Sequence, residues 1–189
     1  MSNIAARELP PAAGGHPDPA DELVAFALGA LPALRLPSGL YCHEQAFGGQ
    51  TAMPVRESSR YSLMVLIGYL RATEGGHPVD VDLEALFARC LERRAQFTAG
   101  DVGLALWADA RLGGAAIAGL LDDLERRLPD ARSLDRLLGM ELAWLVIGLC
   151  HAGHRSAGVV APFLGLLEHL RSVRQAPSGL YYHDNASLL

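Results

Sequence analysis

The sequence predicts an all-α fold built from antiparallel helical hairpins, and three observations carry this prediction. Apolar residues recur at helical spacing along almost all of the 189 residues, without a convincing alternating strand. Nearly apolar segments alternate with amphipathic ones, and Gly or Pro residues separate them. One loop motif occurs twice, each time directly after a segment with Leu-rich helical periodicity.

The first half of the chain is expected to contain three helices and one long loop. A flexible tail rich in Ala, Gly and Pro, 1–18, precedes a first helix at about 19–34. Gly48 and Gly49 interrupt the pattern, so a loop is expected over 37–57. The following helix, about 58–73, is apolar nearly all round, which is typical of a buried helix.

An amphipathic helix, about 81–96, belongs on the outside, and the same contrast then repeats. A largely apolar helix is expected at about 101–112 and an outer one at about 115–128. The last pair is an apolar helix at about 133–151 and a mixed one at about 159–173. Residues 19–189 therefore form a single helical-hairpin domain.

Composition excludes several classes of function. All sixteen basic residues are Arg, so Schiff-base lysines, pyridoxal-phosphate anchors and P-loop lysines are excluded. The net charge of −5 argues against nucleic-acid binding, and charged residues interrupt every apolar stretch before it is long enough to span a membrane. Three scattered cysteines, Cys42, Cys90 and Cys150, indicate free thiols, and without a secretory signal the chain is expected to be cytoplasmic.

The repeated motif is the strongest candidate for a functional surface. Six of its eight positions are identical, and both copies end in an acid: Pro37-Ser38-Gly39-Leu40-Tyr41-Cys42-His43-Glu44 and Pro177-Ser178-Gly179-Leu180-Tyr181-Tyr182-His183-Asp184. Tyrosine rings stack on sugar rings, while a His–acid pair can exchange protons or hydrogen-bond hydroxyl groups. The alternative is a structural turn whose tyrosine packs on helix ends.

The pattern also resembles the (α/α) toroids, which include six-hairpin glycosidases, sugar epimerases and terpenoid-cyclase-type barrels. The phrases similar to carbohydrate-acting members are Ser178 to Asp184, Gly100 to Trp107, and Glu141-Leu142-Ala143-Trp144. The resemblance implies a partial toroid or open half-ring, or one half of a larger toroid, since the chain supplies fewer helices than a closed ring. It also implies self-association or a partner chain that covers the open side.

These considerations give two sets of candidate site residues. The expected catalytic groups are Glu141, Asp101, His43 and His183. The expected ligand-binding groups are Tyr41, Tyr181, Tyr182, Trp107, Trp144, Glu44 and Asp184.

The two carboxylates also have structural explanations. Asp101 follows Gly100 and could simply cap a helix. Glu141 stands among apolar residues, where burial would raise its pKa as a general acid requires, or where it could pair with Arg60 or Arg136.

No cofactor is expected, and no metal site, because the Cys150-His151 and His154 group lacks a second cluster with matching spacing. A carbohydrate-active or carbohydrate-binding protein is the favoured function, with a saccharide or other small molecule as ligand. Two alternatives stay open: a non-catalytic helical scaffold or partner-binding module, and a terpenoid-cyclase-like protein. The residues leave open whether the chain is an enzyme.

Overall fold

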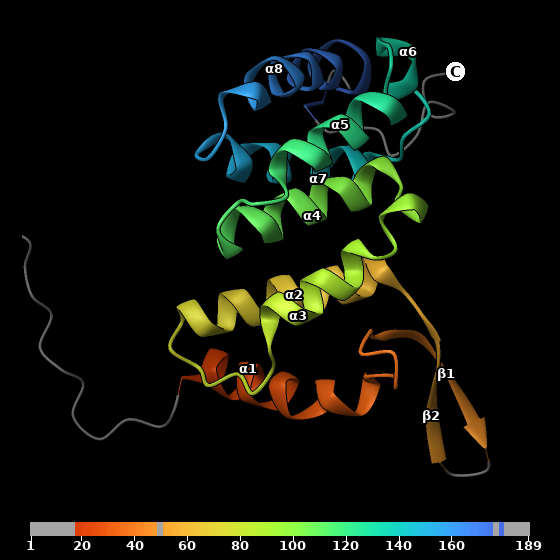
Figure 1. Cartoon of the computed structure of the whole chain (residues 1–189), viewed down its shortest axis with the longest axis vertical. Coiled ribbons are helices and arrows are strands. Elements are labelled where there is room, and N and C mark those ends of the chain that lie inside the picture. Colours follow the sequence, from red (N-terminus) through yellow and green to blue (C-terminus); the bar gives the residue numbers. More distant parts are fainter. Residues whose placement is uncertain (1–17, 49–50, 176–177, 180–189) are drawn as a thin grey trace, which may run out of the picture.

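A computed structural model describes residues 18–48, 51–175 and 178–179 of the chain. Most of these residues are helical, as predicted, and the longer helices stack above one another (Figure 1). The elements in chain order are α1 (Pro19–Ala30), the 3-10 turn η1 (Leu31–Leu34), β1 (Cys42–Gly48), β2 (Thr51–Glu57), α2 (Ser59–Glu74), α3 (Leu83–Leu91), η2 (Arg94–Gln96), α4 (Ala99–Leu112), α5 (Ile117–Arg127), α6 (Ala131–Leu134), α7 (Gly139–Gly153), η3 (Ala157–Val159), α8 (Val160–His169) and the π-helical turn η4 (Leu170–Arg174).

The helices form two layers. In the inner layer, α4 lies between α2 and α7 and packs against both. In the outer layer, α3 packs on α2 and α4, α5 packs on α4, and α8 packs on α7. Inner and outer helices alternate along the chain, in agreement with the predicted helical hairpins. The three inner helices run in the same direction and all begin on the side of the β-hairpin (Figure 1).

The inner helices repeat with a period of 40 residues. Their N-cap residues are Ser58, Thr98 and Leu138, each 40 positions after the one before. The hydroxyls of Ser58 and Thr98 accept hydrogen bonds from backbone N–H groups of the first turn. Leu138 has no side-chain acceptor, but its own N–H donates to the Glu141 carboxylate over 3.2 Å, as the N–H of Thr98 does to Asp101. Side chains of the three first turns therefore lie at equivalent positions at one end of the molecule.

The helices α4 and α7 approach each other more closely than side chains would allow. A Cβ atom on Gly103 would lie 2.7 Å from the backbone C and O of Trp144 and from the N of Leu145. Gly148 on α7 faces the Gly103 backbone in the same way. Because both positions lack a side chain, the two backbones meet directly, and this contact fixes how the second and third inner helices are placed.

The segment expected to be a long loop instead contains a β-hairpin, so the prediction of a chain without strands is wrong there. The strands β1 and β2 pair in antiparallel register from Cys42↔Glu57 to Gly48↔Thr51. The Gly48-Gly49 pair had indicated only a break in the helical pattern, whereas Gly48 is the last residue of β1 and pairs with Thr51. The strands carry few large apolar residues, so hydrophobic alternation is weak.

Three predicted helices are also shorter than expected. The first is interrupted by the 3-10 turn containing Pro32, which has no N–H to donate. The third ends as an α-helix at Leu91 and is followed by η2. The helix predicted over 133–151 is divided into α6 and α7, because Leu138 adopts an extended conformation with ψ of 150°. None of the described helices is both long and apolar enough to cross a membrane.

Large exposed apolar side chains gather at the two edges of the stack. Nine of the ten in the described part of the chain belong to the first two or last two long helices and their caps: Leu23, Phe26, Tyr61, Met64, Leu138, Met140, Ile147, Val160 and Leu164. The tenth, Met53, lies on β2. The central helices α3, α4 and α5 contribute none. The composition of α2 had suggested a helix that is buried all round. This is wrong, because one face of α2 points away from the other helices.

Candidate functional site

The starts of the three inner helices bring a group of polar side chains together, which we call the rim cluster: Arg60, Thr98, Asp101, Glu141 and Trp144. Arg60 on α2 donates through Nε to Asp101 Oδ1 over 2.6 Å and through Nη2 to Thr98 Oγ1 over 3.0 Å. The same Nη2 atom lies 3.7 Å from Glu141 Oε1. One guanidinium thus connects carboxylates of the second and third inner helices.

Both carboxylates also have backbone partners. Asp101 Oδ2 accepts the N–H of Thr98 over 2.9 Å, completing a reciprocal capping box at the start of α4. Glu141 accepts the N–H of Leu138 at the start of α7. The two acids are buried, and their partners match carboxylates that carry a negative charge. The hydrogen bond to Asp101 holds the pKa of Arg60 above its usual value, against the opposing effect of burial.

Trp144 provides the apolar floor of the rim cluster. The guanidinium carbon of Arg60 lies 5.3 Å from the centroid of the Trp144 ring, within the range of a cation–π contact. Gly100 makes room for this arrangement, since a Cβ there would lie 2.8 Å from Glu141 Cγ and 3.0 Å from Trp144 Cε3. Of the two alternatives for Glu141, the structure shows an ion-pair contact with an arginine, and the partner is Arg60.

A polar depression of about 330 Å³ opens beside the rim cluster, and we call it the rim depression. Its described lining contains eight polar residues and one apolar residue: Glu57, Ser58, Ser59, Arg60, Arg93, Gln96, Phe97, Thr98 and Asp101. Arg93 is in ion-pair contact with Glu57, just as Arg60 is with Asp101. Each arginine of the lining therefore already has a carboxylate partner.

The first copy of the repeated motif is largely structural. Tyr41 is only 1% exposed, and its hydroxyl lies 2.8 Å from that of Tyr69 on α2. Its backbone N–H donates to the Ser62 hydroxyl over 2.8 Å. Burial, together with the Tyr69 contact, raises the pKa of the Tyr41 phenol above its usual value. The expectation that Tyr41 stacks on a ligand does not agree with this position, because its ring is enclosed in the core.

Other predicted site residues lie apart from the rim cluster. His43 on β1 is exposed, with its ring 5.9 Å from that of Tyr61. Glu44 pairs with Arg56 across the hairpin, over 3.4 Å. Trp107 stacks on His151 with 5.3 Å between ring centroids, which links α4 to α7 farther along the inner helices.

Most of the second motif copy lies outside the described residues, including the predicted site residues Tyr181, Tyr182, His183 and Asp184. The described residues around it repeat the first copy's backbone. Gly39 and Gly179 have φ of 85° and 84°, in the left-handed region that favours glycine. Arg35 and Gln175, which stand two positions before each motif, have φ/ψ of −82°/128° and −84°/119°.

The sequence identified the acids of the rim cluster but missed most of the rim depression. Glu57, Arg93 and Gln96 come from the hairpin and from η2, which were expected to be a loop and a helix end. Thr98 carried a usable signal, because Thr98 and Asp101 stand at the spacing of a capping box. Among the residues that the structure describes, no group of three or more His, Cys, Asp or Glu side chains could hold a metal ion.

Comparison with known proteins gives no match: no family model, no curated protein and no solved structure matches this chain. The function is therefore argued from the geometry alone.

Proposed function

We propose that the chain binds a neutral saccharide in the rim depression and does not cleave it. The observation that supports this proposal is the polar, charge-balanced lining of that depression. Sugars present many hydroxyls that both donate and accept hydrogen bonds, so they suit a lining of hydroxyl, amide, guanidinium and carboxylate groups.

Charge balance favours a neutral ligand over an anionic one. Arg60 and Arg93 are paired with Asp101 and Glu57, and Glu141 adds a further negative charge near Arg60. A phosphate or carboxylate ligand would have to displace one of these acids from its arginine. A sugar hydroxyl can instead hydrogen-bond to the carboxylate lone pairs and guanidinium N–H groups that face the depression, without breaking the ion pair.

Binding without catalysis is favoured because the two acids already have structural partners. Asp101 and Glu141 each accept a backbone N–H at a helix start, and both lie beside Arg60. A general acid or base must be able to reach the substrate. Glu141 does not belong to the described lining of the rim depression, and Asp101 is buried with both oxygens bonded to Arg60 or Thr98, so neither carboxylate is placed for that task.

Saturation-transfer NMR with maltose and cellobiose tests this proposal, with glucuronate as an anionic comparison. The variant Ser59→Ala/Gln96→Ala removes two side-chain partners from the depression and leaves the rim cluster intact. Loss of one or two hydrogen bonds is expected to weaken binding by about twofold to tenfold. The matched control is Gln45→Ala, since Gln45 is exposed on β1 outside the depression.

The proposal fails if neither disaccharide receives saturation at millimolar concentration, or if glucuronate binds more tightly than both. It also fails if Gln45→Ala weakens binding as much as the double variant does.

A second candidate function is assembly, and the apolar edges favour it. Met140, Ala143 and Ile147 form one exposed stripe on α7. The residues 40 positions earlier, Gly100, Gly103 and Trp107, are the ones that α7 itself covers on α4. The stripe is thus the position at which a further inner helix would pack, as an open half-ring of an (α/α) toroid requires.

We infer that a second copy of this chain covers the apolar edges. Sedimentation velocity at micromolar concentration is expected to give a species larger than a monomer. Ile147→Glu should shift that species toward the monomer, whereas Met53→Glu should not, because Met53 is also an exposed apolar residue but lies on the hairpin. A wild-type monomer, or equal effects of the two variants, would contradict this candidate.

A further inference from the structure

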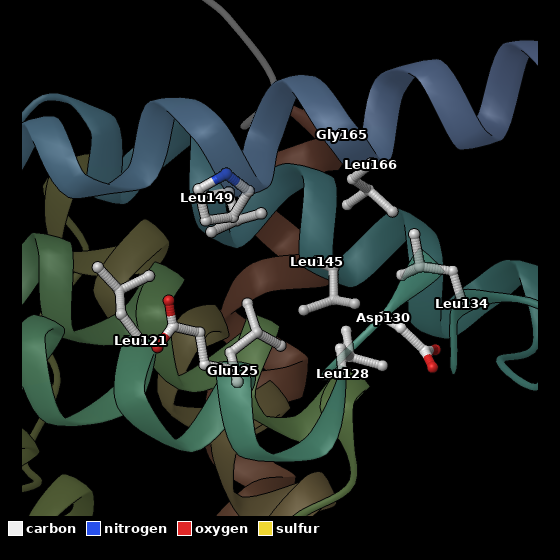
Figure 2. A pocket seen from close by; sticks show the side chains of 11 residues that line it. Leu121, Glu125, Leu128, Asp130, Leu134, Leu145, Leu149, Gly165 and Leu166 are labelled. Atoms are coloured by element: carbon white, nitrogen blue, oxygen red, sulfur yellow. The ribbon is translucent and has the colours of Figure 1, made fainter. Parts of the chain in front are cut away.

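An apolar pocket lies at the opposite end of the stack from the β-hairpin, among α5, α6, α7 and α8. Its volume is about 290 Å³. Figure 2 shows the side chains that surround it, with leucines from all four helices pointing toward the same space. The pocket shares no residue with the rim depression, so it can be tested separately.

On the α8 side, the pocket is lined by two residues with little or no side chain to fill it. Gly165 lies in its wall, and a Cβ at that position would meet no atom within 4 Å. Pro162 lines the same side, one turn earlier on α8. Leu145 and Leu149 of α7 form the floor beneath and are almost fully buried.

The lining of this pocket is apolar except for two carboxylates. Nine of the eleven described lining residues are Leu, Pro or Gly, and the other two are Glu125 and Asp130. In Figure 2 these two acids flank the pocket on opposite sides. No basic side chain belongs to the described lining, and the neighbouring Arg126 forms an ion pair with Asp123.

Asp130 caps the start of α6. Its Oδ1 accepts hydrogen bonds from the backbone N–H and the hydroxyl of Ser133, over 2.9 and 2.8 Å. These bonds lower the pKa of the Asp130 carboxyl. The pocket therefore combines an apolar body with negative charge at its edge.

We propose that this pocket binds a compact apolar molecule carrying a protonated amine. An engineered apolar cavity of about 150 Å³ holds benzene, so a pocket about twice that volume suits a bicyclic aromatic body. The ring would lie against Leu145, Leu149 and Leu166, and the ammonium group would face Glu125 at the edge. This chemistry combines a mostly apolar pocket with one polar contact that orients the ligand.

Naphthylmethylamine is a suitable probe, with naphthylmethanol and naphthylacetate as neutral and anionic molecules of similar ring size. Calorimetry on the full chain is expected to rank their affinities as amine, then alcohol, then carboxylate. Glu125→Gln should weaken amine binding by about threefold to fivefold, as expected for an exposed ion pair, and should leave the alcohol unaffected. Amide chemical-shift changes on the wild type should be confined to α5, α6, α7 and α8.

Gly165→Leu places a side chain in the pocket and should reduce binding of both the amine and the alcohol more than tenfold. Gly29→Leu is its matched control, because Gly29 also has no atom within 4 Å of a Cβ but lies on α1. The proposal is overturned if the carboxylate binds as tightly as the amine, or if Gly165→Leu binds like the wild type. Shift changes elsewhere in the wild-type chain would overturn it even if the variant failed to fold.

Discussion

The contact between α4 and α7 gives the sharpest prediction about stability. In Gly103→Ala the added methyl carbon would lie 2.7 Å from three backbone atoms of Trp144 and Leu145. Backbone atoms cannot rotate away as a flexible side chain can, so the two helices must separate. Overpacking of this kind costs about 1–3 kcal/mol, and three backbone contacts place Gly103 near the upper end.

Alanine also has a better helix propensity than glycine, which offsets the loss by about 1 kcal/mol. The free energy of unfolding of Gly103→Ala should therefore fall by about 2 kcal/mol, which lowers Tm by roughly 4–8 °C for a chain of this size. Differential scanning calorimetry at matched protein concentration measures this shift.

The matched control is Gly68→Ala, in the interior of α2, where a Cβ would meet no atom within 4 Å. Only the propensity gain applies there, so Tm should rise by roughly 1–4 °C. If Gly103→Ala is as stable as Gly68→Ala, the two backbones do not touch, and the described arrangement of the inner layer is wrong.

Three further predictions concern buried polar groups. Arg60→Met leaves Asp101 and Glu141 without their shared cation. Because Arg60 is 30% exposed, solvent screens part of the lost electrostatic stabilisation. The free energy of unfolding, measured by chemical denaturation, should fall by about 2 kcal/mol. Burial raises the pKa of Asp109, so ionised Asp109 lowers folding stability at neutral pH. Asp109→Asn should therefore raise Tm at neutral pH. This gain should decrease as the pH falls through the raised pKa and should be absent below the ordinary pKa of Asp. Cys150 is exposed whereas burial raises the pKa of the Cys90 thiol to about 12, so a thiol reagent should label Cys150 in the native chain and Cys90 only after unfolding.

The helical part of the fold could be predicted because its signal is local. Apolar periodicity identified the inner and outer helices, and most errors were at boundaries. The hairpin could not be identified in this way, because neither strand alternates polar with apolar residues: three polar residues stand together in β1 (His43, Glu44, Gln45), and four apolar residues stand together in β2 (52–55). The 40-residue period also escaped detection: Ser58, Thr98 and Leu138 share a position but not a residue type.

The only part of the candidate site that could be predicted is a charged residue within an otherwise apolar segment, because burial of an unpaired charge is unfavourable. Glu141 stands among apolar residues, which indicated a charged partner, and the structure supplies Arg60 from a helix 81 positions away in sequence. The contributions of Arg93 and Glu57 depend on how the hairpin meets η2, which no local pattern encodes. Long-range pairing of this kind follows from tertiary packing and not from spacing.

The first copy of the repeated motif connects the end of η1 to β1. In the first copy, Gly39 supplies the left-handed turn, and Tyr41 enters the core beside Ser62 and Tyr69 of α2. The similarity of the two copies extends further than the acid, since Gln45-Ala46 corresponds to Asn185-Ala186. The flanking backbone of the second copy matches as well, at Gln175 and Gly179. In the first copy, these turn and core contacts account for Gly39 and Tyr41 without any ligand. A ligand-binding role for the motif therefore has to rest on its exposed His–acid end, where His43 and Glu44 face away from the core.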